Sequence, residues 1–195
     1  MSSRLVATSL AGLFALALSL SALLTAASSA QAEERVCRGT IGAATVDNLT
    51  VPSGATCTLN GTKVKGTITV ERGARLFANG VSVVGNIQSE GFQTVSVKGG
   101  STVGGSVHLE NGLSDGSGRV INTRINGDLQ FFSNEARMIA RGNTIMANLQ
   151  AVSNTGGVVI QNNRISENLQ CKQNSPPPTG GGNTAGDKED QCAGL

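Results

Sequence analysis

The sequence predicts an all-β fold, a right-handed parallel β-helix of about seven coils with a period of about 20 residues. Two observations predict it: a short apolar phrase returns at a nearly constant interval, and large aromatic side chains are scarce. The 195 residues include 5 Phe, no Tyr and no Trp. A core without bulky anchors must bury many small and β-branched side chains in regular layers.

Seven phrases along the chain share one template, in which Val or Ile stands three or four residues before a second aliphatic residue. They read TVDNLT, KVKGTIT, SVVGNIQ, TVGGSVH, RINGDLQ, TIMANLQ and RISENLQ. The second aliphatic residues are spaced by 19 to 22 residues, and such a period is typical of a solenoid. They should stack as one core column, and they are Leu49, Ile68, Ile87, Val107, Leu129, Leu149 and Leu169.

A second apolar element lies between the phrases, for example TCTL from Thr56 and TVSV from Thr94. These elements are short and rich in β-branched residues, and Gly or Asn bounds them, so they read as strands. Two or three strands per period, paired with the next coil about 4.8 Å away, describe a parallel β-helix. A β-sandwich with coincidental regularity is the alternative.

Polar residues flank the predicted core column on both sides. The residue before each core aliphatic should lie at a bend where stacked amides hydrogen-bond and left-handed backbone angles are tolerated. The residue after it should point outward. The first set is Asn48, Thr67, Asn86, Ser106, Asp128, Asn148 and Asn168, and the second is Thr50, Thr69, Gln88, His108, Gln130, Gln150 and Gln170.

The N-terminal segment, residues 1–32, has the order of a cleavable signal peptide: Arg4, an apolar run, and then Ala30-Gln31-Ala32. An uncleaved membrane anchor is the alternative. The first cysteine, Cys37, does not stand at the cleavage point, so no lipid anchor is expected. We therefore expect a protein that is secreted to the extracellular space or held in the cell envelope.

The four cysteines form two pairs separated by about one coil. Cys37 and Cys57 are 20 residues apart, and Cys171 and Cys192 are 21 apart, which a disulfide between stacked coils can span. The even count and the absence of CxxC favour disulfides over metal or redox chemistry. Three pairings are possible, and the local one places a clip at each end of the solenoid.

The last segment differs in composition from the rest of the mature chain. Residues 33–172 carry the repeats and are expected to form the β-helix. Residues 173–195 contain three consecutive prolines and a triple glycine, which is typical of a linker or tail. If a disulfide ties this segment back, it forms an irregular cap over the end of the core, and a loose tail is the alternative.

Candidate catalytic chemistry is sparse. The acidic residues, among them Glu71, Glu90 and Glu110, are expected to be scattered and not to recur in one register of adjacent coils. No catalytic residue, metal site or cofactor is therefore predicted. The net charge of +2 gives no indication of a nucleic-acid partner. A small carbohydrate-active enzyme, a polysaccharide lyase or hydrolase, remains the alternative by analogy of fold.

A regular row of amides is the candidate binding surface. It could lie along a polysaccharide chain, and a solvated structural row is the alternative. Lys63, Arg124 and Arg164 share another register and could attract acidic glycans weakly. We expect an exported non-catalytic structural or surface protein that contacts cell-wall or extracellular glycan, or itself. The candidate residues are Gln88, His108, Gln130, Gln150 and Gln170.

The C-terminal region carries a resemblance to known proteins. NLQC from Asn168, followed by GGGN and GDKEDQC, resembles the end of small exported bacterial proteins with repeated NG[DN]LQ units and no assigned activity. The resemblance covers residues 120–195 and implies a β-helix and export. In architecture the chain is also similar to pectate-lyase-like solenoids and to bactofilins, which polymerise end to end but are cytoplasmic and lack a signal peptide.

Overall fold

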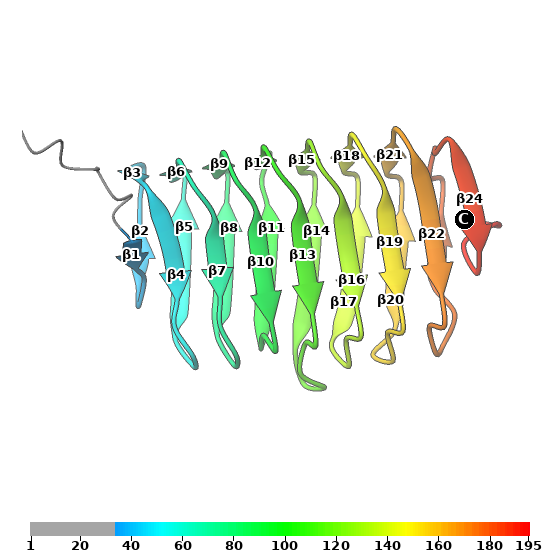
Figure 1. The fold of residues 1–195 in the computed structure, drawn as a ribbon, viewed down its shortest axis with the longest axis horizontal. Helices are drawn as coiled ribbons and strands as arrows, with labels where there is room; N and C mark the ends of the chain where they lie inside the picture. The colour runs from blue at the N-terminus through cyan, green and yellow to red at the C-terminus, as the bar shows by residue number, and fades with distance from the viewer. Residues whose placement is uncertain (1–33) are drawn as a thin grey trace, which may run out of the picture. The chain divides into compact units, whose positions relative to one another are not determined.

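The computed structural model describes residues 34–195, and the predicted signal peptide lies outside the described residues. Within this range every regular element is a β-strand, and the strands form three parallel sheets. Figure 1 shows the strands of one sheet running down in front and those of a second running up behind, while the chain advances from left to right. The coil is therefore right-handed, as predicted.

The first seven coils each contribute one strand to each sheet in the order A, B, C, and the last coil contributes strands to sheets A and B alone. Sheet A consists of β1 (Glu34–Val36), β4 (Asn48–Val51), β7 (Ile68–Val70), β10 (Ile87–Glu90), β13 (Val107–Glu110), β16 (Leu129–Phe132), β19 (Leu149–Val152), β22 (Asn168–Lys172) and β24 (Asp187–Asp190). Sheet B consists of β2 (Thr40–Ile41), β5 (Thr56–Asn60), β8 (Arg75–Asn79), β11 (Thr94–Lys98), β14 (Ser117–Ile121), β17 (Arg137–Arg141), β20 (Val158–Gln161) and β23 (Thr179–Gly181). Sheet C consists of β3 (Thr45–Val46), β6 (Lys63–Val64), β9 (Ser82–Val83), β12 (Thr102–Val103), β15 (Arg124–Ile125), β18 (Thr144–Ile145) and β21 (Arg164–Ile165).

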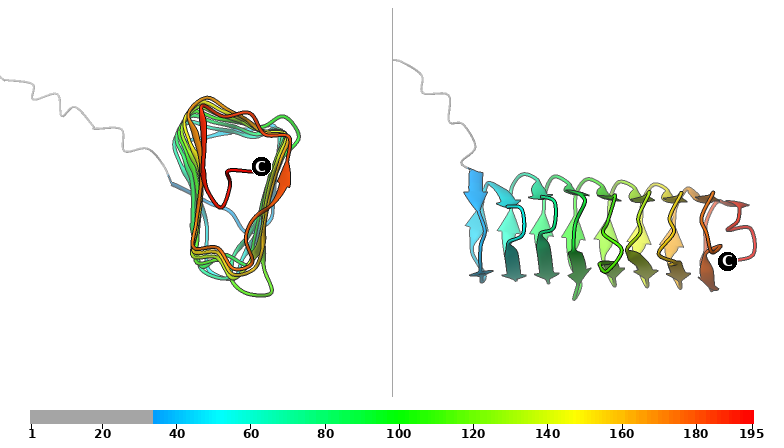
Figure 2. Two further views of the ribbon diagram at one scale, coloured as in Figure 1. Left: turned by 90° about the vertical axis from the view of Figure 1, so that its right-hand side faces the viewer. Right: turned by 90° about the horizontal axis from the view of Figure 1, so that it is seen from below.

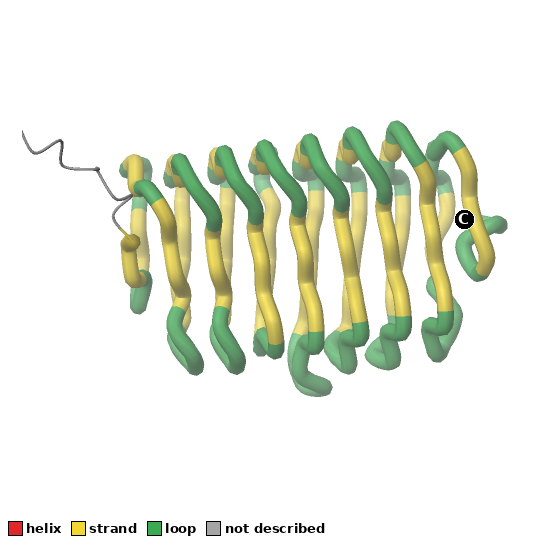
Figure 3. Tube along the Cα trace, in the orientation of Figure 1, coloured by secondary structure: helices red, strands yellow, loops and turns green. Residues whose placement is uncertain are grey.

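Viewed along its axis, the solenoid is a stack of nearly superimposed rectangular coils, with sheets A and B as the two long, opposed sides (Figure 2). Loops occupy the corners, and the corner that leads from sheet C into sheet A repeats almost unchanged from coil to coil (Figure 3). The apolar elements predicted between the phrases are the strands of sheet B, as the pairing of β5 with β8 and of β8 with β11 shows.

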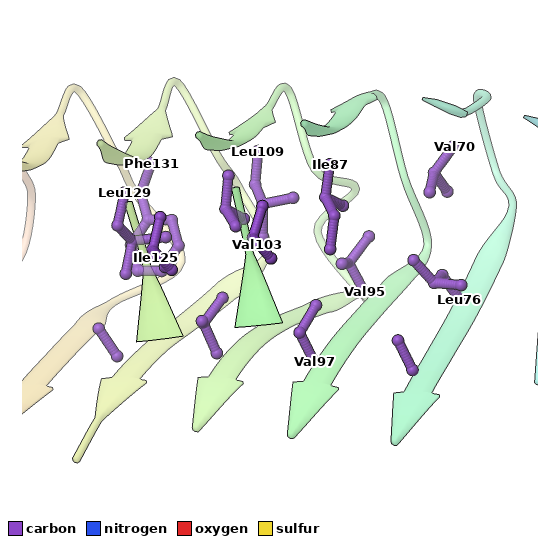
Figure 4. Close-up of a cluster of buried hydrophobic side chains, with 14 of the residues drawn as sticks. Val70, Leu76, Ile87, Val95, Val97, Val103, Leu109, Ile125, Leu129 and Phe131 are labelled. Atoms are coloured by element: carbon purple, nitrogen blue, oxygen red, sulfur yellow. The ribbon is translucent and has the colours of Figure 1, made fainter. Parts of the chain in front are cut away.

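The predicted core column is confirmed. Its residues pair in one register through sheet A, as in Ile68–Ile87 and Leu129–Leu149, and all are fully buried. Figure 4 shows side chains of sheets A and B meeting between the two sheets, with Ile87 near Val95. Gly118, an inward position of β14, leaves room for Met138 of the next coil, because a Cβ there would meet the Met138 thioether.

The stack has about eight coils, one more than predicted, because sheet B contains eight strands. The first coil begins with β1, which lacks the repeated phrase and was missed for that reason. At the other end, the Pro- and Gly-rich segment adds β23 to sheet B and β24 to sheet A, with Gln170 opposite Glu189. This segment therefore continues the coil and lies over the end of the core.

The polar column before the core residues is hydrogen-bonded from coil to coil, as predicted. The Asn48 side-chain oxygen accepts from the Thr67 N–H at 3.0 Å, and that of Asn148 accepts from the Asn168 N–H at 3.1 Å. The expectation of left-handed backbone angles at this bend is wrong, because positive φ values occur at other corners, among them Asn122 and Ser133. The side-chain bonds alone explain the amides here.

Two further asparagine ladders lie inside the solenoid. At the corner after sheet A, Asn134, Asn154 and Asn174 stack: the Asn154 oxygen accepts from the Asn134 N–H and Nδ2, while Asn154 Nδ2 donates to Phe131 O at 2.8 Å. At the corner after sheet B, Asn143, Asn163 and Asn183 make the same pattern. Each amide thereby satisfies backbone groups that the corner removes from the sheets.

A residue in left-handed conformation precedes each of these internal asparagines. Ser133 has φ 53°, Ser153 has 57° and Asn162 has 55°, and glycine occupies the same place at Gly142 and Gly182. The positive φ turns the chain so that the following side chain enters the interior. The internal ladders therefore explain the glycine and asparagine content of these corners.

Both disulfides follow the local pairing. Cys37–Cys57 has a Cα–Cα distance of 5.6 Å and Cys171–Cys192 one of 5.2 Å. The first joins the first coil to the second, and the second joins β22 to the segment after β24. Terminal coils lack one neighbour and fray first, so the clips lie where they restrain fraying most. Two disulfides are typical of a protein that folds in an oxidising compartment.

Replacing Cys171 and Cys192 together by Ser should lower the free energy of unfolding by about 3 kcal/mol, because the disulfide closes a loop of about 20 residues. Hydrogen exchange should speed up first in β23 and β24. The Cys37→Ser/Cys57→Ser variant is the matched control, with faster exchange at the opposite end. Equal acceleration along the whole stack in both variants would contradict the terminal-clip interpretation.

Replacing Asn154 by Ala should destabilise the protein by about 2 to 4 kcal/mol, because the Asn134 N–H and the Phe131 carbonyl lose their partners in a buried corner. Urea unfolding measures the loss. Asn126→Ala is the control, since Asn126 is exposed and its side chain makes no hydrogen bond among the described residues. A loss below about 1 kcal/mol for Asn154→Ala would show that water replaces the amide.

Candidate functional site

The candidate binding residues lie in one outward-facing column of sheet A, which we call the amide column. Gln88 pairs with His108, His108 with Gln130, Gln130 with Gln150, and Gln150 with Gln170. Strand alternation turns these side chains outward while Leu129 and its equivalents point into the core. Thr50 and Thr69 precede the column in the same register, and Glu189 follows it.

A directional chain of hydrogen bonds runs through much of the amide column. Gln130 Nε2 donates to Gln150 Oε1 at 2.9 Å, Gln150 Nε2 to Gln170 Oε1 at 2.7 Å, and Gln170 Nε2 to Glu189 Oε2 at 3.1 Å. The Glu189 carboxylate can only accept, so it sets the direction of the whole chain. Each amide uses its oxygen and one hydrogen in the ladder, and its second N–H hydrogen remains available on the surface.

His108 stands at the start of this chain and contacts a second column. Its Nδ1 lies 2.7 Å from Gln130 Oε1, and its Nε2 lies 2.9 Å from Glu110 Oε2. Both neighbouring atoms are side-chain oxygens that can accept a hydrogen bond from the ring. The Phe132 ring packs edge-on at a centroid distance of 5.3 Å. His108 is therefore held in place by three neighbours of sheet A.

Three glutamates form a second outward column on sheet A, which we call the carboxylate column. Glu90 pairs with Glu110, and Glu71 stands one residue past Val70, which pairs with Ser89. The expectation that the acidic residues do not share a register is therefore wrong. The signal was present in the sequence, because each glutamate stands three residues after a core aliphatic residue. The column ends at Phe132, which pairs with Glu110.

A shallow groove of about 560 Å³ runs beside the carboxylate column. It brings carboxylate, imidazole, amide and guanidinium groups together on coils that are neighbours in space. These groups can hydrogen-bond hydroxyl and amino groups of a ligand that lies across the coils. Its polar lining comes from Ser53, Thr69, Glu71, Arg72, Gln88, Ser89, Glu90, His108 and Glu110.

Glu71 is anchored at one end of this groove. Its Oε2 accepts hydrogen bonds from the Ser53 N–H at 2.8 Å and from Ser53 Oγ at 2.9 Å. These bonds, the backbone bond first, lower the pKa of the Glu71 carboxyl, and the positive charge of Arg38 adds to the effect. Glu71 therefore connects sheet A to the loop that leads into β5, and it keeps its charge into the acid range.

The remaining predicted surface residues lie on another side of the solenoid. Lys63, Arg124 and Arg164 occupy one column of sheet C, separated by Ser82, Thr102 and Thr144.

Residues 34–195 contain no cluster of three or more His, Cys, Asp and Glu side chains placed to hold a metal ion. The part of the chain that the structure describes has no helix that meets the length and apolarity required to cross a membrane.

The Glu71–Ser53 contact should loosen as the pH falls through the lowered pKa of Glu71. The bonds favour the ionised form, so the stability they add is present above the ordinary glutamate pKa of about 4.3 and is lost as the carboxyl protonates below it. Carbon NMR titration of Glu71 measures this pKa. Ser53→Ala should move it part of the way back, because the backbone N–H still donates; no change in that variant would contradict the assignment.

Comparison with known proteins gives this chain no relative from which a role could be carried over. No protein-family model, no curated protein and no solved structure matches it significantly.

Proposed function

We propose that the protein is an exported, non-catalytic rod that contacts an extended polysaccharide in the cell envelope or the extracellular space through the outer face of sheet A. The observation that carries the proposal is the amide column, which offers a similar polar group once per coil. A linear polymer presents similar groups at regular intervals, and a column of this kind can meet several of them together. Weak contacts then add along one chain.

The carboxylates of sheet A restrict the class of polysaccharide that this face can bind. The carboxylate column lies beside the amide column. The carboxylate of Glu189 ends the amide column. An acidic glycan would be repelled by these groups, whereas a neutral or amino-bearing glycan would not. We therefore propose a neutral or amino-bearing polysaccharide as the ligand of this face. Export is supported by the two disulfides and by the N-terminal sequence.

A carbohydrate-active enzyme is the second candidate, and one observation favours it. The carboxylate column places glutamates on adjacent coils, about 4.8 Å apart along the axis, beside His108 and inside a groove. Pairs of carboxylates at about 5 to 9.5 Å serve retaining and inverting glycosidases. However, Glu71 and Glu110 are engaged by Ser53 and His108, and the groove is shallow, so the binding role is the better supported one.

One screen separates the two candidates. The purified protein is incubated with neutral, amino-bearing and acidic polysaccharide fragments, with and without calcium, and the products are analysed for new ends. We expect a neutral or amino-bearing fragment to bind without being cleaved. New reducing or unsaturated ends would overturn the non-catalytic proposal and favour the enzyme, with Glu90→Gln as the variant that should then abolish cleavage.

The binding face can be tested in the same assay. Gln130→Ala/Gln150→Ala should weaken binding about tenfold, since two coils lose their polar groups. Gln161→Ala removes an amide from sheet B and should have no effect. Self-association is followed by sedimentation of the same samples. A strict monomer would remove the version of the proposal in which the rod also assembles with itself.

A further inference from the structure

The charges of the described residues are segregated between opposite faces. The strands of sheet B contain no Asp or Glu and carry a series of Arg and Lys side chains, all of them exposed. The acidic residues that lie in strands are all in sheet A, among them Glu90 and Glu110, although sheet A also carries Arg35, Lys172 and Lys188. The net charge of +2 conceals this separation. The cations of sheet B are Arg75, Lys98, Arg119, Arg137 and Arg141.

The cations of sheet B lie in columns that the strand pairing defines. Arg75 and Arg137 belong to one edge column, with Thr94 and Ser117 between them. Lys98 belongs to the opposite edge column. Outward side chains alternate along a strand, so the two edge columns stand four residues, or about 13 Å, apart.

A partly apolar strip separates the two edge columns. Phe77 is 38% exposed, which is high for its size, and Ile139 and Val159 are half-buried in the same column. Ser96 and Arg119 interrupt the strip between Phe77 and Ile139. Sheet B therefore presents a partly apolar central column that includes Arg119, with further cations along both edges.

These cations form no ion pair with the residues that the structure describes. Among residues 34–195 the ion pair of a Lys or Arg with a carboxylate joins Lys65 to Asp47, so no cation of sheet B lies at ion-pair distance from a carboxylate. Like charges spaced along one face repel each other. A bound polyanion would remove that repulsion and gain attraction on each coil.

We infer that the outer face of sheet B, from β8 to β20, binds an extended acidic polysaccharide whose sugar units carry carboxylates. A sugar ring of such a chain is about as long as the rise of one coil, so successive rings can follow successive coils. The ring faces would contact Phe77, Ile139 and Val159, and the carboxylates would reach the cations at both edges. This inference goes beyond the proposed function, because it assigns a second ligand to the opposite face.

Two other partners, single-stranded nucleic acid and a second copy of this chain, match this face less well. Single-stranded nucleic acid is held mainly by successive aromatic side chains, and Phe77 is the aromatic residue in the strands of sheet B. A second copy could place its carboxylate column on sheet B, but that column spans only Glu71 to Glu110 and ends at Phe132, whereas the cations continue to Arg141. The experiment below distinguishes both of these partners from an acidic polysaccharide.

The test uses a linear oligogalacturonate and its neutral methyl ester, with binding to the purified protein measured by calorimetry at low and high salt. We expect the acid to bind more tightly than the ester, and salt to weaken the complex with the acid but not any complex with the ester. Arg75→Gln/Arg119→Gln/Arg137→Gln should weaken binding about tenfold or more. The control Lys63→Gln/Arg124→Gln/Arg164→Gln removes the same charge from sheet C and should weaken it less than about threefold.

Equal losses in the two triple variants would overturn the inference, because the effect would then follow net charge alone. Tighter binding of a single-stranded oligonucleotide of equal charge would replace the glycan by nucleic acid. Self-association that the sheet B variant abolishes, without oligogalacturonate binding, would assign the face to a second copy. Should the triple variant not fold, Lys98→Gln/Arg141→Gln tests the other edge. These outcomes do not depend on whether a neutral glycan binds to sheet A.

Discussion

The hydrogen bond between one coil and the next is the interaction on which the rest of this structure depends. Parallel pairing forces each residue to lie over its equivalent about 4.8 Å away, so side chains at equivalent positions stack in columns. Where the chain turns a corner and strand pairing stops, the internal asparagines restore the bonds: Asn154 and Asn163 each accept from the asparagine of the preceding coil and donate to a backbone carbonyl of that same coil. The corners are therefore as regular as the sheets.

The same constraint generates the surfaces. Because outward positions also stack, a residue type that recurs with the period becomes a continuous stripe. Sheet A carries a stripe of amides linked head to tail and ended by Glu189, and beside it a short stripe of glutamates. Sheet B carries cations around an apolar strip. The two faces lie on opposite long sides of the coil (Figure 2). A rod with these faces could bridge a neutral and an acidic polymer without any change of conformation.

The filled interior of the solenoid leaves only its outer faces for contact with a ligand. Its core is filled by aliphatic side chains between sheets A and B (Figure 4), so ligands can be met only on the outer faces. Those faces are flat, and the groove beside the carboxylate column is open to solvent along its length. Charged groups in such a position act on a ligand through screened, modest attractions. The affinity of such a surface for a polymer would come from contacts repeated along the axis and not from a deep cleft.

The sequence by itself determined the period, the strands, the core column, the amide column and both disulfides, because each of these depends on spacing that can be counted along the chain. The carboxylate column was missed although its signal was present in the sequence, since Glu71, Glu90 and Glu110 each stand three residues after a core aliphatic residue. The internal asparagines were also missed: an Asn at a corner points inward or outward according to the φ angle of the residue before it, as at Ser153. The segregation of charge was decided by the tertiary structure alone, because residues such as Arg119 and Glu110 are close in the chain, and only the turn between sheets A and B sends them to opposite faces.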